Sequence, residues 1–185
     1  MAFNIDGFKS KFGDGGARPN LFRAKINLPS GISIPGGLDS QGTYMIKSAQ
    51  IPSATVTAID VPYFGRQVRV AGNRTFEPWT VTIINSESFD IRNAMEQWMA
   101  GINSHEGNRQ SAADNSLSSY KADAFVEHLN KKGDQDRPIA TYQFHGLFPT
   151  EISSIELGWE NNDTIEEFTV TFAYDYWHHT NIVNN

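Results

Sequence analysis

The sequence predicts a mainly β fold, an antiparallel β-sandwich or split barrel with one α-helix. In several segments apolar side chains fall on every second residue, and the longest such run covers residues 168–177. A period of two is typical of strands that bury one face. Only residues 88–102 repeat apolar side chains at spacings of three and four, which is the pattern of an amphipathic helix. We therefore expect about eight to ten strands and one helix.

Length and composition indicate one folded domain over residues 1–185. Of the 185 residues, 39% are hydrophobic and 19% are charged, a balance found in folded rather than disordered chains. The absence of cysteine excludes disulfides, zinc–thiolate sites and thiol nucleophiles. A formal charge of −6 argues against a protein that grips duplex DNA, because that affinity comes mainly from Lys and Arg. We expect neither a targeting segment nor a membrane-spanning helix.

The first part of the chain reads as an arm, a strand and a loop. Residues 1–16 are rich in Gly, Lys and Asp and carry a few apolar anchors, which predicts a mobile N-terminal arm. Residues 20–28 alternate cleanly and predict a strand with Phe22, Ala24, Ile26 and Leu28 on its buried side. The Gly- and Pro-rich residues 29–42 predict an irregular loop.

Four more strands precede the helix, at residues 44–51, 55–61, 66–70 and 79–84. Pro52 and Pro62 should end the first two, since proline is confined to edges and turns of sheets. The third should stop at residues 71–73. In the fourth, we expect Trp79, Val81 and Ile83 to share one face.

In the helix of residues 88–102, Ser86 or Ser88 can supply the N-terminal cap and Gly101 is expected to end it. The Ser-, Asn- and Gly-rich residues 103–119 then predict a long loop.

The second half predicts four strands and a short tail. Residues 122–129 and 139–148 should pair across a charged hairpin tip, and residues 152–159 also alternate. The run 168–177 should be a single strand. One face of it would be lined by Phe168, Val170, Phe172, Tyr174 and Tyr176. Residues 178–185 form the tail.

Motifs of catalysis and of metal or cofactor binding are weak throughout, so we expect no enzymatic activity, metal or cofactor. The five histidines match no His-Glu-x-x-His or His-x-His spacing, and His178 and His179 would point to opposite faces of a strand. A pair of carboxylates from distant strands could still form a glycosidase site. The four tryptophans could form a sugar or base platform, although packing in the core is the simpler interpretation.

Five short segments, in this order, resemble the tail tube proteins of contractile-tailed bacteriophages. They are Ala17–Phe22, Gly65–Arg66 with Val70–Phe76, Trp79–Thr82, Gly146–Thr150 and Tyr174–Trp177. The resemblance runs from about Ala17 to Trp177. Residues 29–42 and 178–185 depart from the family pattern, so no role is carried onto them.

The resemblance implies a structural virion protein that forms homohexameric rings with a continuous inner β-barrel. Stacked rings would make the tail tube, enclosed by a contractile sheath, bounded by baseplate and tail-terminator proteins, and filled by a tape-measure protein before DNA passes without specific binding. Such a tube would be assembled in the host cytoplasm. Two alternatives stay open: the tube of a phage-derived injection particle or secretion system, and a carbohydrate-binding β-sandwich that uses Trp159 or Trp177.

Within the matched segments, seven residues are candidates for contacts between subunits: Arg18, Pro19, Asn20, Arg66, Arg74, Tyr176 and Trp177. We also expect the arm and the two long loops to order on neighbouring subunits. The acidic balance suggests a net negative channel, in which phosphates would meet few cations.

Overall fold

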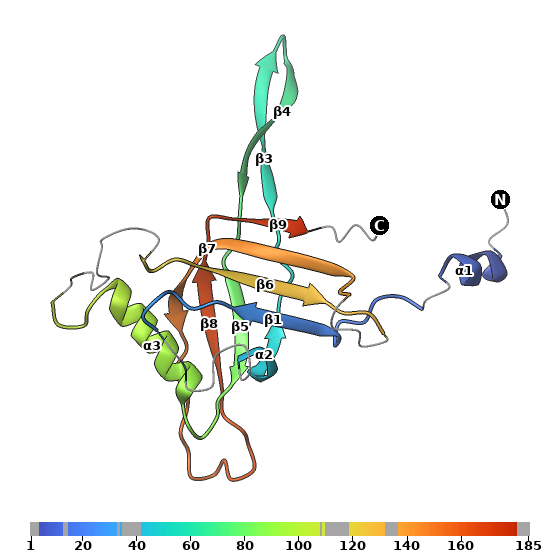
Figure 1. Ribbon diagram of the computed structural model, residues 1–185. Helices are drawn as coiled ribbons and strands as arrows, with labels where there is room; N and C mark the ends of the chain where they lie inside the picture. The colour runs from blue at the N-terminus through green and yellow to red at the C-terminus, as the bar shows by residue number, and fades with distance from the viewer. Residues whose placement is uncertain are drawn as a thin grey trace.

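The computed structural model describes residues 4–12, 15–32, 34, 42–107, 109, 119–131 and 137–180. These residues form nine strands and three helices. Two antiparallel sheets share one strand, and a two-stranded hairpin projects away from them (Figure 1). The predicted antiparallel β fold is confirmed. The expected single helix is wrong, because two short helices, α1 (Ile5–Lys11) and α2 (Gly42–Met45), accompany the predicted one, α3 (Asp90–Ile102).

The shared strand is β7, which bends at Gly146. Its first half lies between β6 and β9, and its second half pairs with β8. Gly146 has φ +68, a left-handed conformation that favours glycine. We call β1-β6-β7-β9 sheet A and β7-β8-β5-β2 sheet B. The bounds are β1 (Phe22–Ile26), β2 (Ile46–Ala49), β5 (Trp79–Ile84), β6 (Ala122–His128), β7 (Ala140–Ile152), β8 (Glu167–Ala173) and β9 (Tyr176–Thr180).

The hydrophobic core fills the space between the two sheets. Trp79 of sheet B stacks on Phe144 of sheet A with ring centroids 4.6 Å apart, and its Nε1 donates to the Gln50 carbonyl. Because the indole N–H is hydrogen-bonded, the large ring can be buried without the free-energy penalty of an unpaired polar group. The predicted inward faces are confirmed where the core is formed: Ala24, Ile26, Trp79, Val81 and Ile83 are all buried.

Helix α3 packs its apolar side on the sheets through Ile91, Ala94, Met95 and Trp98. Neither predicted serine caps it. Ser86 and Ser88 bond to each other, and Phe89 occupies the N-cap in a left-handed conformation, φ 54. Gly101 does not end the helix either, because the Asn103 N–H still donates to the Met99 carbonyl.

Residues 168–177 are not one strand, as the alternation had predicted. Phe168, Val170 and Phe172 are buried on β8, whereas Tyr176, on β9, is half exposed. The two strands pair with different halves of β7, so the chain must turn at residues 174–175, opposite the bend of β7. The period of two continues across this turn and conceals it.

Four other predicted strands differ from the structure. Residues 44–51 begin inside α2, and only Ile46–Ala49 are extended. Residues 153–158 form no strand after β7 ends at Ile152. Strand β3 (Thr55–Tyr63) passes through Pro62 and β4 (Arg66–Thr75) passes through residues 71–73. Because β3 pairs only with β4, proline's missing N–H can face solvent there.

Most of the predicted arm (1–16) is described, and Ile5–Lys11 in it form α1; residues 1–3 and 13–14 lie outside the described residues. Most of the loops 29–42 and 103–119 and of the tail 178–185 also lies outside the described residues. Within the described part of the chain, no helix has the length and apolar character needed to cross a membrane.

Candidate assembly surface

Among the described residues, exposed large apolar side chains gather in three separate places. The first is the hairpin β3–β4, the second is the loop between β7 and β8, and the third is the short N-terminal helix α1. Figure 1 shows the hairpin and α1 reaching well beyond the sheets. Exposed apolar patches of this kind usually mark surfaces that contact another protein.

The hairpin is apolar and solvent-exposed along its length. Its exposed apolar side chains are Val56, Ile59, Val61, Tyr63, Phe64, Val68 and Val70. A two-stranded ribbon has no core of its own and is at best marginally stable when it stands alone in water. The length of this hairpin therefore indicates that something covers it in the working assembly.

The hairpin ends in a two-residue turn formed by Phe64 and Gly65, with φ 43 and φ 77. Both positive angles match the tight turn that suits twisted hairpins, in which Asn-Gly is the favoured pair. Phenylalanine at position 64 lowers the stability of the turn, because a bulky side chain disfavours the left-handed backbone conformation. Its side chain is 91% exposed and its ring contacts only that of Tyr63. Local strain without an internal contact to offset it suggests a role in binding.

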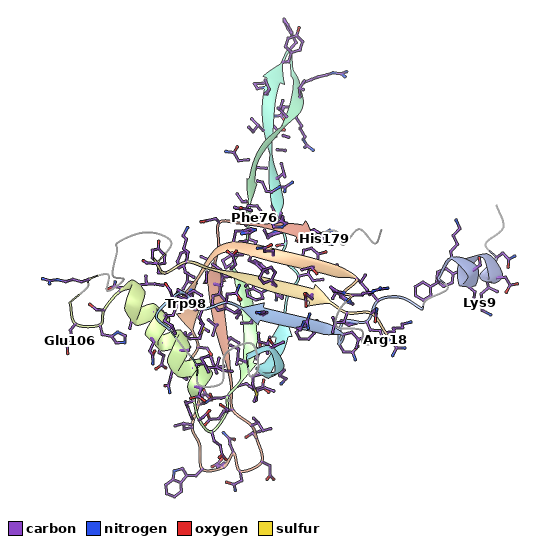
Figure 2. The ribbon with its side chains drawn as sticks, viewed as in Figure 1. Lys9, Arg18, Phe76, Trp98, Glu106 and His179 are labelled. Atoms are coloured by element: carbon purple, nitrogen blue, oxygen red, sulfur yellow. The ribbon has the colours of Figure 1, made fainter. Side chains whose placement is uncertain are left out.

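The base of the hairpin is fixed to the sheets by an aromatic cluster. Phe76 follows β4 and contacts Tyr174 and Trp177 at centroid distances of 6.0 and 6.5 Å (Figure 2). Trp177 Nε1 donates to the Ser53 carbonyl at 3.1 Å, and Tyr174 Oη donates to the Glu77 carbonyl at 2.8 Å. Burial, and then the nearby Glu77 carboxylate, raise the pKa of Tyr174. These ring contacts and hydrogen bonds together fix the direction in which the hairpin projects from sheet A.

Among the described residues, sheet A ends at β1 on one side and at β9 on the other, and neither pairs with a further strand. On β1, backbone bonds of Leu21 with Leu129 and of Asn27 with Asp123 set which residues face β6. By the alternation of antiparallel ladders, the N–H and C=O groups of Phe22, Ala24 and Ile26 point away from β6, on the side where α2 lies close to β1 and where Ala24 and Ile26 are buried. Unpaired edge groups of this kind can accept a strand from another chain.

The outer face of sheet A carries a cluster of polar and aromatic rings. His145 stacks on Tyr176 at 4.7 Å and on His178 at 4.9 Å. Its Nε2 lies 3.0 Å from Nδ1 of His178, and its Nδ1 lies 3.3 Å from the Asp123 carboxylate. His179 points the other way, toward Tyr142, so the prediction that His178 and His179 face opposite sides is confirmed. Among the described residues, no three potential ligands are placed to hold a metal ion.

The predicted contact residues fall on different parts of this surface. Arg18, Pro19 and Asn20 lie in the turn that leads into β1, and Figure 2 shows Arg18 between α1 and the sheets. Arg66 and Arg74 lie at the tip and base of the hairpin. Tyr176 and Trp177 begin β9, where Tyr176 faces outward and Trp177 packs inward on Tyr142.

Sequence reasoning missed Phe64 and Leu157 as exposed residues, and it named Trp159 only for carbohydrate binding; the three are 91%, 82% and 99% exposed. The Phe64-Gly65 pair could have been recognised as a hairpin turn between two alternating runs. Leu157 and Trp159 were instead assigned to a strand. No described ring packs against Trp159, which therefore lacks the aromatic neighbour of a carbohydrate platform.

A β-sandwich with exposed apolar surfaces and a long projecting hairpin has the features of a protein that assembles with other chains. The family model of phage tail tube proteins matches residues 17–180, so the chain belongs to that family. The tail tube protein gp19 of Enterobacteria phage T4 is 33% identical over 87% of this chain and 90% of its own length. That of Serratia phage KSP90 is 28% identical over 88% of each. The chain is thus a structural component of a virion tail.

Solved structures show the same fold at low sequence identity. A chain of the anti-feeding prophage baseplate matches with a TM-score of 0.63 and 11% identity, over 89% of this chain and 95% of that one. A chain of the sheath–tube complex of an extracellular contractile injection system matches with a TM-score of 0.53 and 14% identity, over 97% and 99%. These likenesses support the fold assignment alone.

Proposed function

We propose that six copies of this chain close into a ring by pairing β1 of one copy with β9 of the next. The observation that carries this proposal is that, in the part of the chain that the structure describes, the edge strands β1 and β9 of sheet A pair with no further strand. Open edges invite aggregation unless they are covered, and closing the sheet into a barrel removes them. Rings then stack into the tail tube. The role is structural and involves no catalysis.

The tube lies inside a contractile sheath, begins on the baseplate and ends at a terminator protein. Before DNA passes, a tape-measure protein fills the channel. Support comes from the family and from the relative in phage T4. The tube of an injection particle would use the same subunit architecture, but phage tail tube proteins match this chain at 28–33% identity over most of its length, which favours a phage tail.

In this arrangement the outer face of sheet A lines the channel, because its inner face packs on sheet B. The charged side chains on that face are Arg23, Lys25, Asp123 and Glu127, two of each sign. Arg23 pairs with Glu127 at 2.5 Å. DNA would therefore slide because the wall offers no excess of cations, rather than because the wall is strongly negative.

The natural absence of cysteine makes this proposal testable by disulfide cross-linking. One cysteine replaces Arg23 or Lys25 on β1, and a second replaces Tyr176, His178 or Thr180 on β9. Within one chain, β6 and β7 separate these strands by about three strand spacings, or ~14 Å. A disulfide needs Cα atoms within about 7 Å. Any bond formed must therefore join two chains.

Oxidised tubes should give a ladder of linked chains that ends at six for at least one cysteine pair. As the matched control, Lys25→Cys is combined with Glu151→Cys on the sheet B half of β7, where no linkage is expected. A ladder that ends at another number would contradict the hexamer. No linkage from any pair in assembled tubes would contradict the β1–β9 contact.

A further inference from the structure

A pair of histidines on the outer face of sheet A belongs to neither the hydrophobic core nor the hairpin. His145 lies on β7 opposite Tyr176, and His178 lies on β9 opposite Gln143. Side chains placed diagonally like this, on one face of two paired strands, are within reach of each other. The pair has no signature in the sequence, because its members are 33 residues apart.

The two imidazole rings present nitrogen atoms to each other. Nε2 of His145 lies 3.0 Å from Nδ1 of His178, and the ring planes are within 10° of parallel. Two lone pairs that face each other at this separation repel unless something positive lies between them. A single proton can do so in an N–H···N bond, and a metal ion can do so by binding both nitrogens, since neutral imidazole is the commonest metal ligand among side chains.

The distance between the nitrogens suits a particular coordination geometry. With metal–nitrogen bonds of about 2.0–2.1 Å, nitrogens 3.0 Å apart subtend an angle of about 91–97° at the metal. This is the angle between neighbouring positions of a square-planar or octahedral ion. The tetrahedral geometry of Zn²⁺ would need the nitrogens about 3.3–3.4 Å apart. Nitrogen ligands in tetragonal geometry are typical of Cu²⁺ and Ni²⁺, and Cu²⁺ binds most tightly of the divalent series.

Asp123 orients His145 as a metal ligand has to be oriented. Its Oδ2 lies 3.3 Å from Nδ1 of His145, so a proton on Nδ1 is directed at the carboxylate and the Nε2 lone pair is left facing His178. The carboxylate is itself held by Gln143 Nε2 at 3.3 Å and by the Gly146 N–H at 3.4 Å. A carboxylate behind the ring nitrogen that does not bind the metal is the usual outer partner of a metal-binding histidine.

The pair is accessible to an ion from solvent. His178 is exposed and the side chain of His145 is 24% exposed, so water can take the coordination positions that the two imidazoles leave. The chain would supply two ligands, which agrees with the lack of any cluster of three potential ligands among the described residues. The charge of Asp123 favours a cation here, because Lys121 binds the Asp175 carboxylate.

We infer that His145 and His178 together bind one divalent transition-metal ion, Cu²⁺ above the others, with water completing its coordination. The ion would join β7 to β9 and hold in place a strand that, among the described strands, pairs with β7 alone. In the proposed ring this strand makes the contact with the next copy, and the ion would lie on the channel wall. Binding itself does not depend on ring closure, because both ligands belong to one copy.

Titration of the full chain with copper(II) sulfate tests the inference. The chain contains no cysteine, so no thiolate competes for the ion. Binding at micromolar protein concentration should saturate at one ion per chain, and electron paramagnetic resonance should show Cu²⁺ coupled to two nitrogen nuclei. Asp123→Asn removes the outer partner and should weaken binding about 10–100-fold. His145→Gln and His178→Gln each remove a ligand and should weaken it at least as much.

His179→Gln is the matched control. It removes the histidine next to His178, whose ring lies on the other face of the sheet against Tyr142, and it should bind Cu²⁺ as the parent does.

Thermal unfolding gives a second measurement. An ion that binds only the folded chain stabilises it, so Cu²⁺ should raise the unfolding temperature of the parent and of His179→Gln but not that of His178→Gln. Because His178 is exposed, its replacement leaves the fold intact, and this variant decides the outcome.

Two results would overturn the inference: no saturable binding by the parent at micromolar concentration, or binding and thermal stabilisation that persist in His178→Gln. A shared proton would then account for the approach of the two rings. A chain that binds Cu²⁺ through both histidines but forms no rings would contradict the proposed function and not the metal site.

Discussion

The carboxylate of Asp175 lies where a side chain on residue 146 would have to go. A Cβ at Gly146 would approach Asp175 Oδ2 to 2.2 Å. Lys121 Nζ holds that carboxylate, at 2.7 and 2.8 Å from its two oxygens, and the Asp175 N–H donates to the His145 carbonyl. The bend of β7 and the turn between β8 and β9 therefore fit together at one point.

Gly146→Ala should destabilise the subunit. Left-handed backbone costs a residue with a Cβ about 1–2 kcal/mol, and the new methyl group would also push Asp175 away from Lys121. The free energy of unfolding, measured by urea denaturation, should fall by at least that amount.

Gly101→Ala is the control for that change. Gly101 lies in α3 with no atom within 4 Å of the added Cβ, so alanine should stabilise the helix by about 0.5–1 kcal/mol. Equal effects at the two glycines would show that the fit at Gly146 does not matter.

Phe64→Asn should separate stability from assembly. Asparagine tolerates the left-handed angle of residue 64 and forms the favoured Asn-Gly hairpin turn with Gly65. The subunit should be as stable as the parent or more stable by up to about 1 kcal/mol. Tubes should nevertheless be fewer and shorter, because the exposed ring is gone. Unimpaired tube formation would mean that Phe64 has no partner.

High pH should weaken the subunit through Tyr174. Its pKa is raised in the folded state, so the neutral phenol is favoured there while the unfolded chain ionises near pH 10. The stability from this group is complete below the unfolded pKa and is lost as pH rises through the folded pKa. Tyr174→Phe should be less stable at neutral pH by about 1 kcal/mol, through loss of the bond to Glu77, yet lose less on going to alkaline pH. Parallel pH profiles for the two proteins would contradict this.

Tryptophan fluorescence should report whether the loop between β7 and β8 is covered when the subunits assemble. Trp79 and Trp98 are already buried, whereas Trp159 is almost fully exposed in one copy. Assembly should therefore shift the emission to shorter wavelength, and Trp159→Phe should abolish most of that shift. A shift that persists in the variant would come from another tryptophan, and would argue against burial of the loop.

The elements that build the core could be predicted because burial imposes a period on the sequence. Trp79, Val81 and Ile83 must all point inward, and their alternation shows it. Phe168 to Tyr176 shows where this reasoning stops. A turn between two strands can preserve the period of two, and here its cause lies at Gly146, far along the sequence.

The candidate surface was harder to predict for a related reason. The hairpin and the 153–167 loop contain apolar residues that alternate or cluster as buried ones do, yet both are exposed. Sequence shows that Val61 or Leu157 is apolar but not whether the covering atoms belong to the same chain. Arg66 and Arg74 were identified only through the family resemblance. The carboxylates of residues 153–167 were interpreted as parts of turns and of a strand.

A cryo-EM reconstruction of the assembled tube tests the central claim most directly. The account predicts six copies per ring, with β1 hydrogen-bonded to β9 of the neighbouring copy and sheet A lining the channel. A ring of another number, or one in which β1 and β9 stay unpaired, would contradict it.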